Sequence, residues 1–236
     1  MNDDDISQRL AAVLSRITRA AARAGRAPDS VRLVAVSKTW PADSVRAAAA
    51  AGQVDFGENR VQEALQKIEA TPGLPLRWHL VGHLQSNKAR KAAQFFHLIH
   101  SIDRPELLEA LDKAALEAGT SPGVLLQVDL AGEPTKHGAP LDAMQPLVEA
   151  ARRCRAVRPQ GLMLLPPYFE DPEEARPYFR RLRQLRDGLA GLGVAPAALA
   201  ELSMGMSHDF EVAIEEGATI VRVGTAIFGT RSSGGQ

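Results

Sequence analysis

VRLVAVSKTWPADSVRAAAAAGQVDFGEN, residues 31–59, contains the repeating unit that decides the fold. The run 31–37 is apolar and rich in valine, which predicts a buried strand. Pro41 opens an alanine-rich stretch over 41–51, which predicts a helix, because proline is favoured in a first helical turn. Gly52 closes this helix, and a second apolar run starts at 54. A strand, a helix and a strand in this order predict two parallel strands joined by a crossover helix.

The same alternation continues along the whole chain of 236 residues. Short apolar runs predict eight strands, at 31–37, 54–56, 78–81, 97–102, 124–130, 160–165, 200–203 and 219–223. Longer amphipathic stretches predict an opening helix at 4–24 and seven interleaved helices, at 41–51, 60–69, 87–95, 105–118, 141–153, 172–189 and 208–216. This pattern predicts an α/β fold, a single (β/α)8 TIM barrel whose extra N-terminal helix covers the remaining gap. A doubly wound sheet is the alternative.

Composition is typical of a folded protein that has no general attraction to polyanions. Hydrophobic residues make up 45% of the chain and charged residues 24%, as in ordinary globular domains. Lysine plus arginine and aspartate plus glutamate both number 28, so the net charge is zero and the basic field of a nucleic-acid binder is missing. We therefore expect no nucleic-acid partner.

Location and domain organisation follow from simple absences in the sequence. No signal peptide and no apolar run of about twenty residues is visible, so we expect no membrane contact. Cys154 is the single cysteine, which favours a reducing compartment, and we expect a cytoplasmic protein. We expect one domain over residues 1–230, a flexible tail over 231–236 and a monomer.

Functional groups of a TIM barrel lie at the carboxyl ends of its strands. The first predicted strand ends in Ser37 and Lys38, so Lys38 faces the predicted mouth. Partial desolvation there would favour the neutral amine, which attacks aldehydes to form Schiff bases. The alternative is a strand-end lysine that pairs with a carboxylate such as Glu58.

The segment SMGMSHDFEVAIEEGATIVRVGTAIFG, residues 203–229, supplies the last two loops of the mouth, which in TIM barrels often hold a phosphate. Gly224 allows backbone N–H groups to approach closely, while Ser207 and Thr225 add hydroxyl groups. Taken singly, Ser207 could be a helix cap and Gly224 a turn residue, but together they favour a phosphate site. Arg222 shares a strand face with Gly224 and therefore points into the mouth.

A phosphate-bearing aldehyde that reaches both ends of this mouth is pyridoxal 5′-phosphate, abbreviated PLP. Its protein needs are an amine for the aldehyde, a cup for the phosphate and a partner for the ring nitrogen. Lys38, the loop that carries Ser207, and Arg222 supply groups of these three kinds. The residues thus predict PLP as the cofactor.

The sequence also resembles a known family. VAVSKTWP, FGENRVQE, WHLVGHLQSNKAR, HSID, GLMLLP and the block 203–229 are similar to segments of the pyridoxal phosphate homeostasis proteins, also called the YggS-like or proline synthetase co-transcribed family. The similarity spans about 33–229. It implies a barrel like the N-terminal domain of alanine racemase, which is the type III fold of PLP proteins.

The resemblance also implies roles for single residues. By similarity Lys38 carries PLP as an aldimine, Arg222 faces the ring nitrogen, and the phosphate is held by Ser207, Gly224 and Thr225. Asn59, in FGEN, looks like a further pocket residue. Asp129 stands where the family usually has asparagine, which leaves its role open, while Lys136 and Gly138 match the family pattern.

Histidines offer little support for a metal site. His79 and His83 have the spacing of a metal pair, but the segment between them lacks glutamate and reads as a strand, so we expect no metal. His97 and His100 flank a short apolar run, and at least one of them is expected to be a hydrogen-bonded core or rim histidine.

Two functions of different classes share this site. A carrier would bind PLP for intracellular PLP homeostasis, with no catalytic residues and with transient contacts to PLP-dependent apoenzymes. The alternative is a racemase-type PLP enzyme, which needs a second base, commonly a tyrosine. Tyr168 and Tyr178 are the only tyrosines, and we expect the first to pack in a loop and the second to lie in a helix. Arg222 beside the ring nitrogen would also oppose its protonation, which weakens an electron sink.

A third possibility is an aldolase that forms a Schiff base on Lys38 without a cofactor. It is disfavoured by analogy alone, because barrel aldolases usually place that lysine on a later strand. We therefore expect the carrier function.

Overall fold

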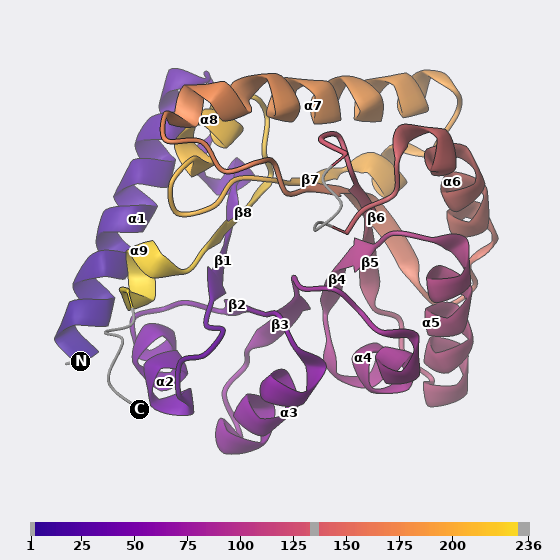
Figure 1. The fold of residues 1–236 in the computed structure, drawn as a ribbon. Helices are drawn as coiled ribbons and strands as arrows, with labels where there is room; N and C mark the ends of the chain where they lie inside the picture. The colour runs from indigo at the N-terminus through magenta and orange to yellow at the C-terminus, as the bar shows by residue number, and fades with distance from the viewer. Residues whose placement is uncertain (1–2, 133–136, 231–236) are drawn as a thin grey trace.

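The computed structural model describes residues 3–132 and 137–230 and shows a closed barrel of parallel strands (Figure 1). Each strand pairs with the next one along the chain, and the last pairs with the first, so that Val34 lies beside Arg222. This closure confirms the TIM barrel and shows that the doubly wound alternative is wrong. The strands are β1 (Arg32–Val36), β2 (Asp55–Glu58), β3 (Arg77–Leu80), β4 (Leu98–Ile102), β5 (Gly123–Val128), β6 (Arg158–Leu164), β7 (Glu201–Ser203) and β8 (Ile220–Val223).

Helices surround the barrel in the order that the sequence predicts. They are α1 (Asp3–Arg23), α2 (Ala42–Ala50), α3 (Val61–Ala70), α4 (Ala89–Phe95), α5 (Pro105–Ala118), α6 (Met144–Arg153), α7 (Arg176–Gly191), α8 (Phe210–Glu215) and α9 (Thr225–Phe228). Three predicted helices open with a 3-10 turn, at Ser86–Lys88, Leu141–Ala143 and Pro172–Ala175, so their α-helical parts begin later than expected. The sequence did not predict α9, because four residues are too few to show a period.

Helix α1 closes the outside of the barrel next to β1 and β8, as expected for the N-terminal helix. Its apolar stripe, made of Ile6, Leu10, Val13 and Ile17, is buried. The helix lies against α2, α8 and α9, so that the indigo first helix is next to the yellow last one (Figure 1). Arg16 adds an ion pair of 2.8 Å to Glu211 on α8.

The core has an outer layer between strands and helices and a smaller one inside the barrel. The inner apolar layer consists of Val34, Val36, Val81, Leu98, Leu125, Met163 and Ile220. Charged and polar side chains share this inner space, among them Arg222 and His100, which is unusual because barrel interiors are mostly filled by branched apolar residues.

Two further expectations concern membrane spans and the C-terminal tail. Within residues 3–132 and 137–230, none of the helices combines the length and the apolar character that a membrane span requires. The expected tail, 231–236, lies outside the described residues. The expected division into a domain over 1–230 and a tail therefore stays a prediction.

Candidate ligand-binding site

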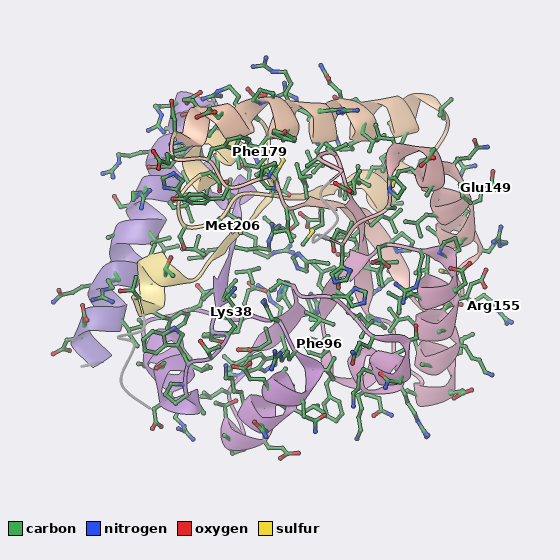
Figure 2. The ribbon with its side chains drawn as sticks, viewed as in Figure 1. Lys38, Phe96, Glu149, Arg155, Phe179 and Met206 are labelled. Atoms are coloured by element: carbon green, nitrogen blue, oxygen red, sulfur yellow. The ribbon has the colours of Figure 1, made fainter. Side chains whose placement is uncertain are left out.

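A cavity of about 500 Å³ opens where the carboxyl ends of the strands meet. All six residues that the sequence analysis selected line it: Lys38, Asn59, Ser207, Arg222, Gly224 and Thr225. Figure 2 shows Lys38 and Met206, another lining residue, near the middle of the ring, whereas Glu149 and Arg155 lie at its outer edge. The volume lies in the usual range for small-molecule sites.

Lys38 lies in a strained turn directly after β1. The backbone of Thr39 has φ of 68°, a left-handed conformation that is unfavourable for a β-branched residue. The amide of Trp40 donates to the carbonyl of Ser37 and closes the turn. Lys38 itself is exposed at the rim of the cavity, so the partial desolvation that we expected is not found.

A buried ionic cluster holds this turn from below. The ammonium group of Lys67, on α3, donates to Glu58 at 2.6 Å, to Glu63 at 2.9 Å and to the carbonyl oxygen of Ser37 at 2.7 Å. The Ser37 hydroxyl also donates to Glu58, and the amide of Thr39 donates to Glu63. Glu58 is therefore the partner of Lys67, and the alternative pairing of Glu58 with Lys38 is wrong. Burial raises the pKa of Glu58 despite these contacts.

The loops after β7 and β8 meet at Ser207. Its Oγ accepts hydrogen bonds from the backbone N–H groups of Gly224, at 3.1 Å, and Ala226, at 3.3 Å. A serine hydroxyl has two acceptor positions and one proton, so two accepted bonds leave the O–H to donate. Ser207 and Thr225 thus bring two hydroxyl groups to the cavity lining, and Gly224, which also lines it, is fixed by its bond to Ser207.

Gly205 shapes the same loop through its backbone. Its φ is +92°, and an added Cβ would lie 2.6 Å from the Cβ of Ala213. The loop is further fixed by Asp209, whose carboxylate accepts from the amide of Met206 at 2.6 Å. The position of Ser207 therefore depends on a glycine that no other residue replaces without strain.

Arg222 lies on β8 and is 4% exposed. Its guanidinium donates to the Ser203 hydroxyl at 2.6 Å and to the carbonyl of Leu164 at 2.8 Å. Burial lowers the pKa of Arg222 to about 10, and the negative charge of Asp209 opposes this shift. Arg222 is therefore charged at neutral pH and presents a fixed donor to the cavity.

Asn59 follows β2 and is placed by a close backbone contact. A Cβ on Gly82 would lie 2.3 Å from the carbonyl oxygen of Asn59, so only glycine fits at position 82. The two loops that follow β2 and β3 thereby meet at the cavity wall. Both residues line the cavity.

The cavity is electropositive. Lys38 and Arg222 supply its positive charge, and no carboxylate occurs among its lining residues in the described chain. A multiply charged anion such as a phosphate is favoured in such a site.

His79 and His83, which have the spacing of a metal pair but for which no metal was expected, lie in different surroundings. His79 is fully buried and contacts Asp55 and His100, while His83 lies at the cavity. His83, Asp103 and His137 do bring three ligand atoms within 4.8 Å of one another. The two imidazole rings are stacked, however, with centroids 3.8 Å apart and planes at 17°.

Nearly parallel rings cannot both aim a lone pair at one ion in their ring planes. Arg104 also donates to the carboxylate of Asp103 at 2.7 Å. We therefore assign no metal to this group.

Three other residues that the sequence analysis discussed are Asp129, Tyr168 and Lys136. Asp129 accepts from the amides of Ala131 and Gly132 at 2.9 Å and stabilises its own turn, so it does not line the cavity. Tyr168 lies on the cavity rim with its ring 5.6 Å from that of His208, and is 76% exposed. Lys136 lies outside the described residues.

Sequence reasoning did not select ten of the lining residues for a ligand role: Val36, Val81, Gly82, His83, Gln127, His137, Leu165, Tyr168, Met206 and His208. Most of them lie at or just after the end of a strand. Applying the strand-end rule to every strand, and not only to the first and the last, would have found them.

Comparisons with known proteins agree with this architecture. Residues 9–232 match the family described as alanine racemase, N-terminal domain. A pyridoxal phosphate homeostasis protein of Aquifex aeolicus (strain VF5) is 47% identical over 224 residues, which cover 95% of this chain and 97% of that protein.

Two solved structures extend the comparison. The structure of PipY from Synechococcus elongatus PCC7942 with PLP bound has a TM-score of 0.84 and 43% identity, and the match covers 95% of this chain and 100% of that one. An alanine racemase from Clostridium difficile 630 in complex with cycloserine has a TM-score of 0.71 at 14% identity, over 98% of this chain and 61% of that one. The racemase similarity shows the fold alone.

Proposed function

The chain belongs to the family of pyridoxal phosphate homeostasis proteins, and from this membership we propose that it binds PLP reversibly at the cavity and acts as an intracellular carrier of it. The observation that supports the proposal most strongly is the convergence of Lys38, Ser207 and Arg222 on one cavity. Lys38 follows the first strand, whereas Ser207 and Arg222 belong to the last two strands and the loop between them, so closure of the barrel brings them together.

The donor set fits PLP. The hydroxyl groups of Ser207 and Thr225 suit a phosphate, the exposed amine of Lys38 suits an aldehyde, and the guanidinium of Arg222 suits a ring nitrogen that accepts a hydrogen bond. The absence of carboxylates among the described lining residues removes repulsion of the phosphate. When bound, PLP supplies an aldehyde that forms a reversible covalent bond with an amine.

Three residues of the cavity then have distinct roles in binding PLP. Lys38 provides the amine, and the cluster around Lys67 holds the turn that carries it. Ser207 orients the N–H groups of Gly224 and Ala226 and donates its own proton. Arg222 can donate but not accept, so it favours an unprotonated ring nitrogen.

Two features favour a carrier over a racemase-type enzyme. Arg222 opposes a positive charge on the ring, which weakens the electron withdrawal that racemisation needs. Tyr168 is the tyrosine that lines the cavity in the described chain, and its exposure at the rim suits contact with solvent or a partner better than proton transfer inside a closed site. An open site with an exposed amine suits release to PLP-dependent apoenzymes.

The test is to incubate the PLP-loaded protein with each common amino acid in deuterated water and to follow exchange of the α-proton by NMR. We expect binding of PLP, seen as a visible absorption band, and less than one exchange event per protein molecule. Repeated turnover with any amino acid would replace the carrier function with an enzymatic one. A protein that binds no PLP would contradict the proposal altogether.

A further inference from the structure

Five polar side chains from five strands form a continuous hydrogen-bonded chain through the barrel interior. Asp55 on β2 contacts His79 on β3 at 2.9 Å, and His79 contacts His100 on β4 at 3.0 Å. His100 contacts Ser203 on β7 at 2.8 Å, and Ser203 accepts from Arg222 on β8 at 2.6 Å. All five residues are buried, and none is more than 5% exposed. We call these residues the interior chain.

The interior chain runs from the floor of the barrel to the cavity. Asp55 is the first residue of β2, and Arg77, the first of β3, donates to both of its carboxylate oxygens at 2.8 Å and 2.6 Å. Arg77 is half exposed, so this end is close to solvent. The other end, Arg222, lines the cavity.

The two ends determine where every proton lies. A guanidinium can only donate, so Ser203 Oγ accepts from Arg222. Among the contacts of the described chain, Nδ1 of His100 is the acceptor that remains for the Ser203 proton, so the hydroxyl donates to it. A carboxylate can only accept, so Nε2 of His79 carries the proton that faces Asp55. The contact between the rings joins Nε2 of His100 to Nδ1 of His79. Because Nδ1 of His100 accepts from Ser203, its Nε2 carries the proton and donates to Nδ1 of His79. Both histidines are therefore neutral, with their proton on Nε2.

A proton added to either ring breaks this order. If Nδ1 of His100 were protonated, it would donate to Ser203, which would then accept two bonds and lose the acceptor for its own proton. Burial lowers the pKa of both His79 and His100, and it does so despite the carboxylate of Asp55 beside His79. The neutral, fully bonded arrangement is thus the stable one at neutral pH.

An apolar barrel interior would avoid the cost of burying polar groups. The interior chain bears this cost and ends at a residue of the ligand cavity. We propose that Asp55, His79, His100 and Ser203 are positioning residues that fix the direction and hydrogen bonding of Arg222 toward the ring of the bound ligand. This inference rests on the proposed binding of PLP, because Arg222 would face its ring nitrogen.

The first test needs no ligand. Long-range ¹H–¹⁵N NMR spectra of the imidazole groups distinguish a proton on Nε2 from one on Nδ1, with His79→Gln and His100→Leu used to assign the signals. We expect both rings to be neutral and protonated on Nε2 at pH 7. A proton on Nδ1 of His100, or a doubly protonated ring, would overturn the proposed order.

The second test separates ring recognition from phosphate recognition. Dissociation constants are measured for PLP and for 1-deaza-PLP, in which a C–H group replaces the ring nitrogen. We expect His100→Leu and Ser203→Ala to weaken PLP binding about 10-fold, the effect of one lost hydrogen bond, and to leave binding of the analogue unchanged. Met163→Leu, an interior substitution outside the cavity lining and the interior chain, is the matched control.

The outcomes distinguish this inference from the proposed function. A wild-type protein that binds neither compound contradicts the proposed function. A wild-type protein that binds PLP, with His100→Leu and Ser203→Ala both binding PLP equally well, contradicts the positioning role alone. If His100→Leu fails to fold, Ser203→Ala and the tautomer measurement on the wild-type protein still decide.

Discussion

Single residues at this site combine exposure with strain. Thr39, next to Lys38, keeps a left-handed backbone conformation that costs of order 1–3 kcal/mol and must be balanced by its surroundings. The surrounding contacts are the bonds from Thr39 and Lys67 to Glu63. The turn therefore fixes the backbone that carries Lys38 at the rim of the cavity.

The first prediction concerns Lys38. PLP-loaded protein is treated with borohydride, which makes the lysine linkage permanent, and the labelled peptide is identified by mass spectrometry. Lys38→Ala is expected to lose more than nine-tenths of the label, because Lys38 is the lysine that lines the cavity in the described chain. Lys113→Ala, at an exposed position of α5, should label as the wild type does. Full labelling of Lys38→Ala would place the linkage on another lysine, with Lys136 the first to examine.

The second prediction concerns Ser207. Ser207→Ala removes the acceptor of two backbone N–H groups and a donor to the phosphate, and a hydrogen bond to a charged group contributes about 1.5–3 kcal/mol. We expect the dissociation constant of PLP to rise about 10- to 100-fold in equilibrium dialysis. Ser15→Ala, on the exposed face of α1, should leave it unchanged. An unchanged constant in Ser207→Ala would remove this loop from the phosphate site.

Elements of the barrel are joined at the site by buried charges. Lys67 on α3 is 5% exposed and links this helix to Glu58 at the end of β2 and to the turn after β1. One oxygen of Glu58, Oε2, is buried without a hydrogen-bond partner in the described chain. The cluster is thus sensitive to loss of its only ammonium group.

The third prediction follows from this sensitivity. Lys67→Met leaves the carboxylate of Glu58 buried without its cation and should lower the free energy of unfolding by about 3–5 kcal/mol at pH 7 in urea denaturation. The loss should shrink toward pH 5, because burial already raises the pKa of Glu58 and protonation removes the unpaired charge. Lys113→Met should change stability by less than about 0.5 kcal/mol.

The double variant Glu58→Gln with Lys67→Met tests whether the unpaired charge of Glu58 causes the loss of stability. It should recover most of the lost stability, because no buried charge remains without a partner. If the double variant is as unstable as Lys67→Met, the cluster contributes through packing and not through charge.

The whole molecule is a closed barrel with a partly polar interior, and this combination couples its stability to pH. Burial lowers the pKa of His79 and His100 below 6.5, whereas the unfolded chain keeps ordinary histidine values. Between about pH 6.5 and the lowered values, the unfolded state binds protons that the folded state does not.

The fourth prediction is a loss of stability on mild acidification. The sign follows because protons bind preferentially to the unfolded chain, so the free energy of unfolding falls as pH drops below about 6.5. Each histidine contributes at most about 1.4 kcal/mol per pH unit, or about 2.8 kcal/mol for the pair. Urea denaturation at pH 7.5, 6.5 and 5.5 measures this slope, and His100→Leu should reduce it. A free energy that stays constant from pH 7.5 to 5.5 would contradict the neutral, buried state of both rings.

The local pattern of the sequence by itself determined the barrel and the ends of its strands. Strand, helix and turn signals are local, so apolar runs such as 31–37 predicted β1 closely, and the opening helix was predicted within one residue at each end. The strand-end rule then selected Lys38 and Arg222, which the structure places at one cavity.

Only the tertiary structure decided which buried charges and polar groups become partners. Glu58 was considered as a partner of Lys38 but pairs with Lys67, because α3 brings Lys67 under the turn. His100 and Ser203 are 103 positions apart in the sequence and meet only because the barrel closes. Such partners share no local pattern, since side-chain direction inside a barrel depends on the register of all eight strands.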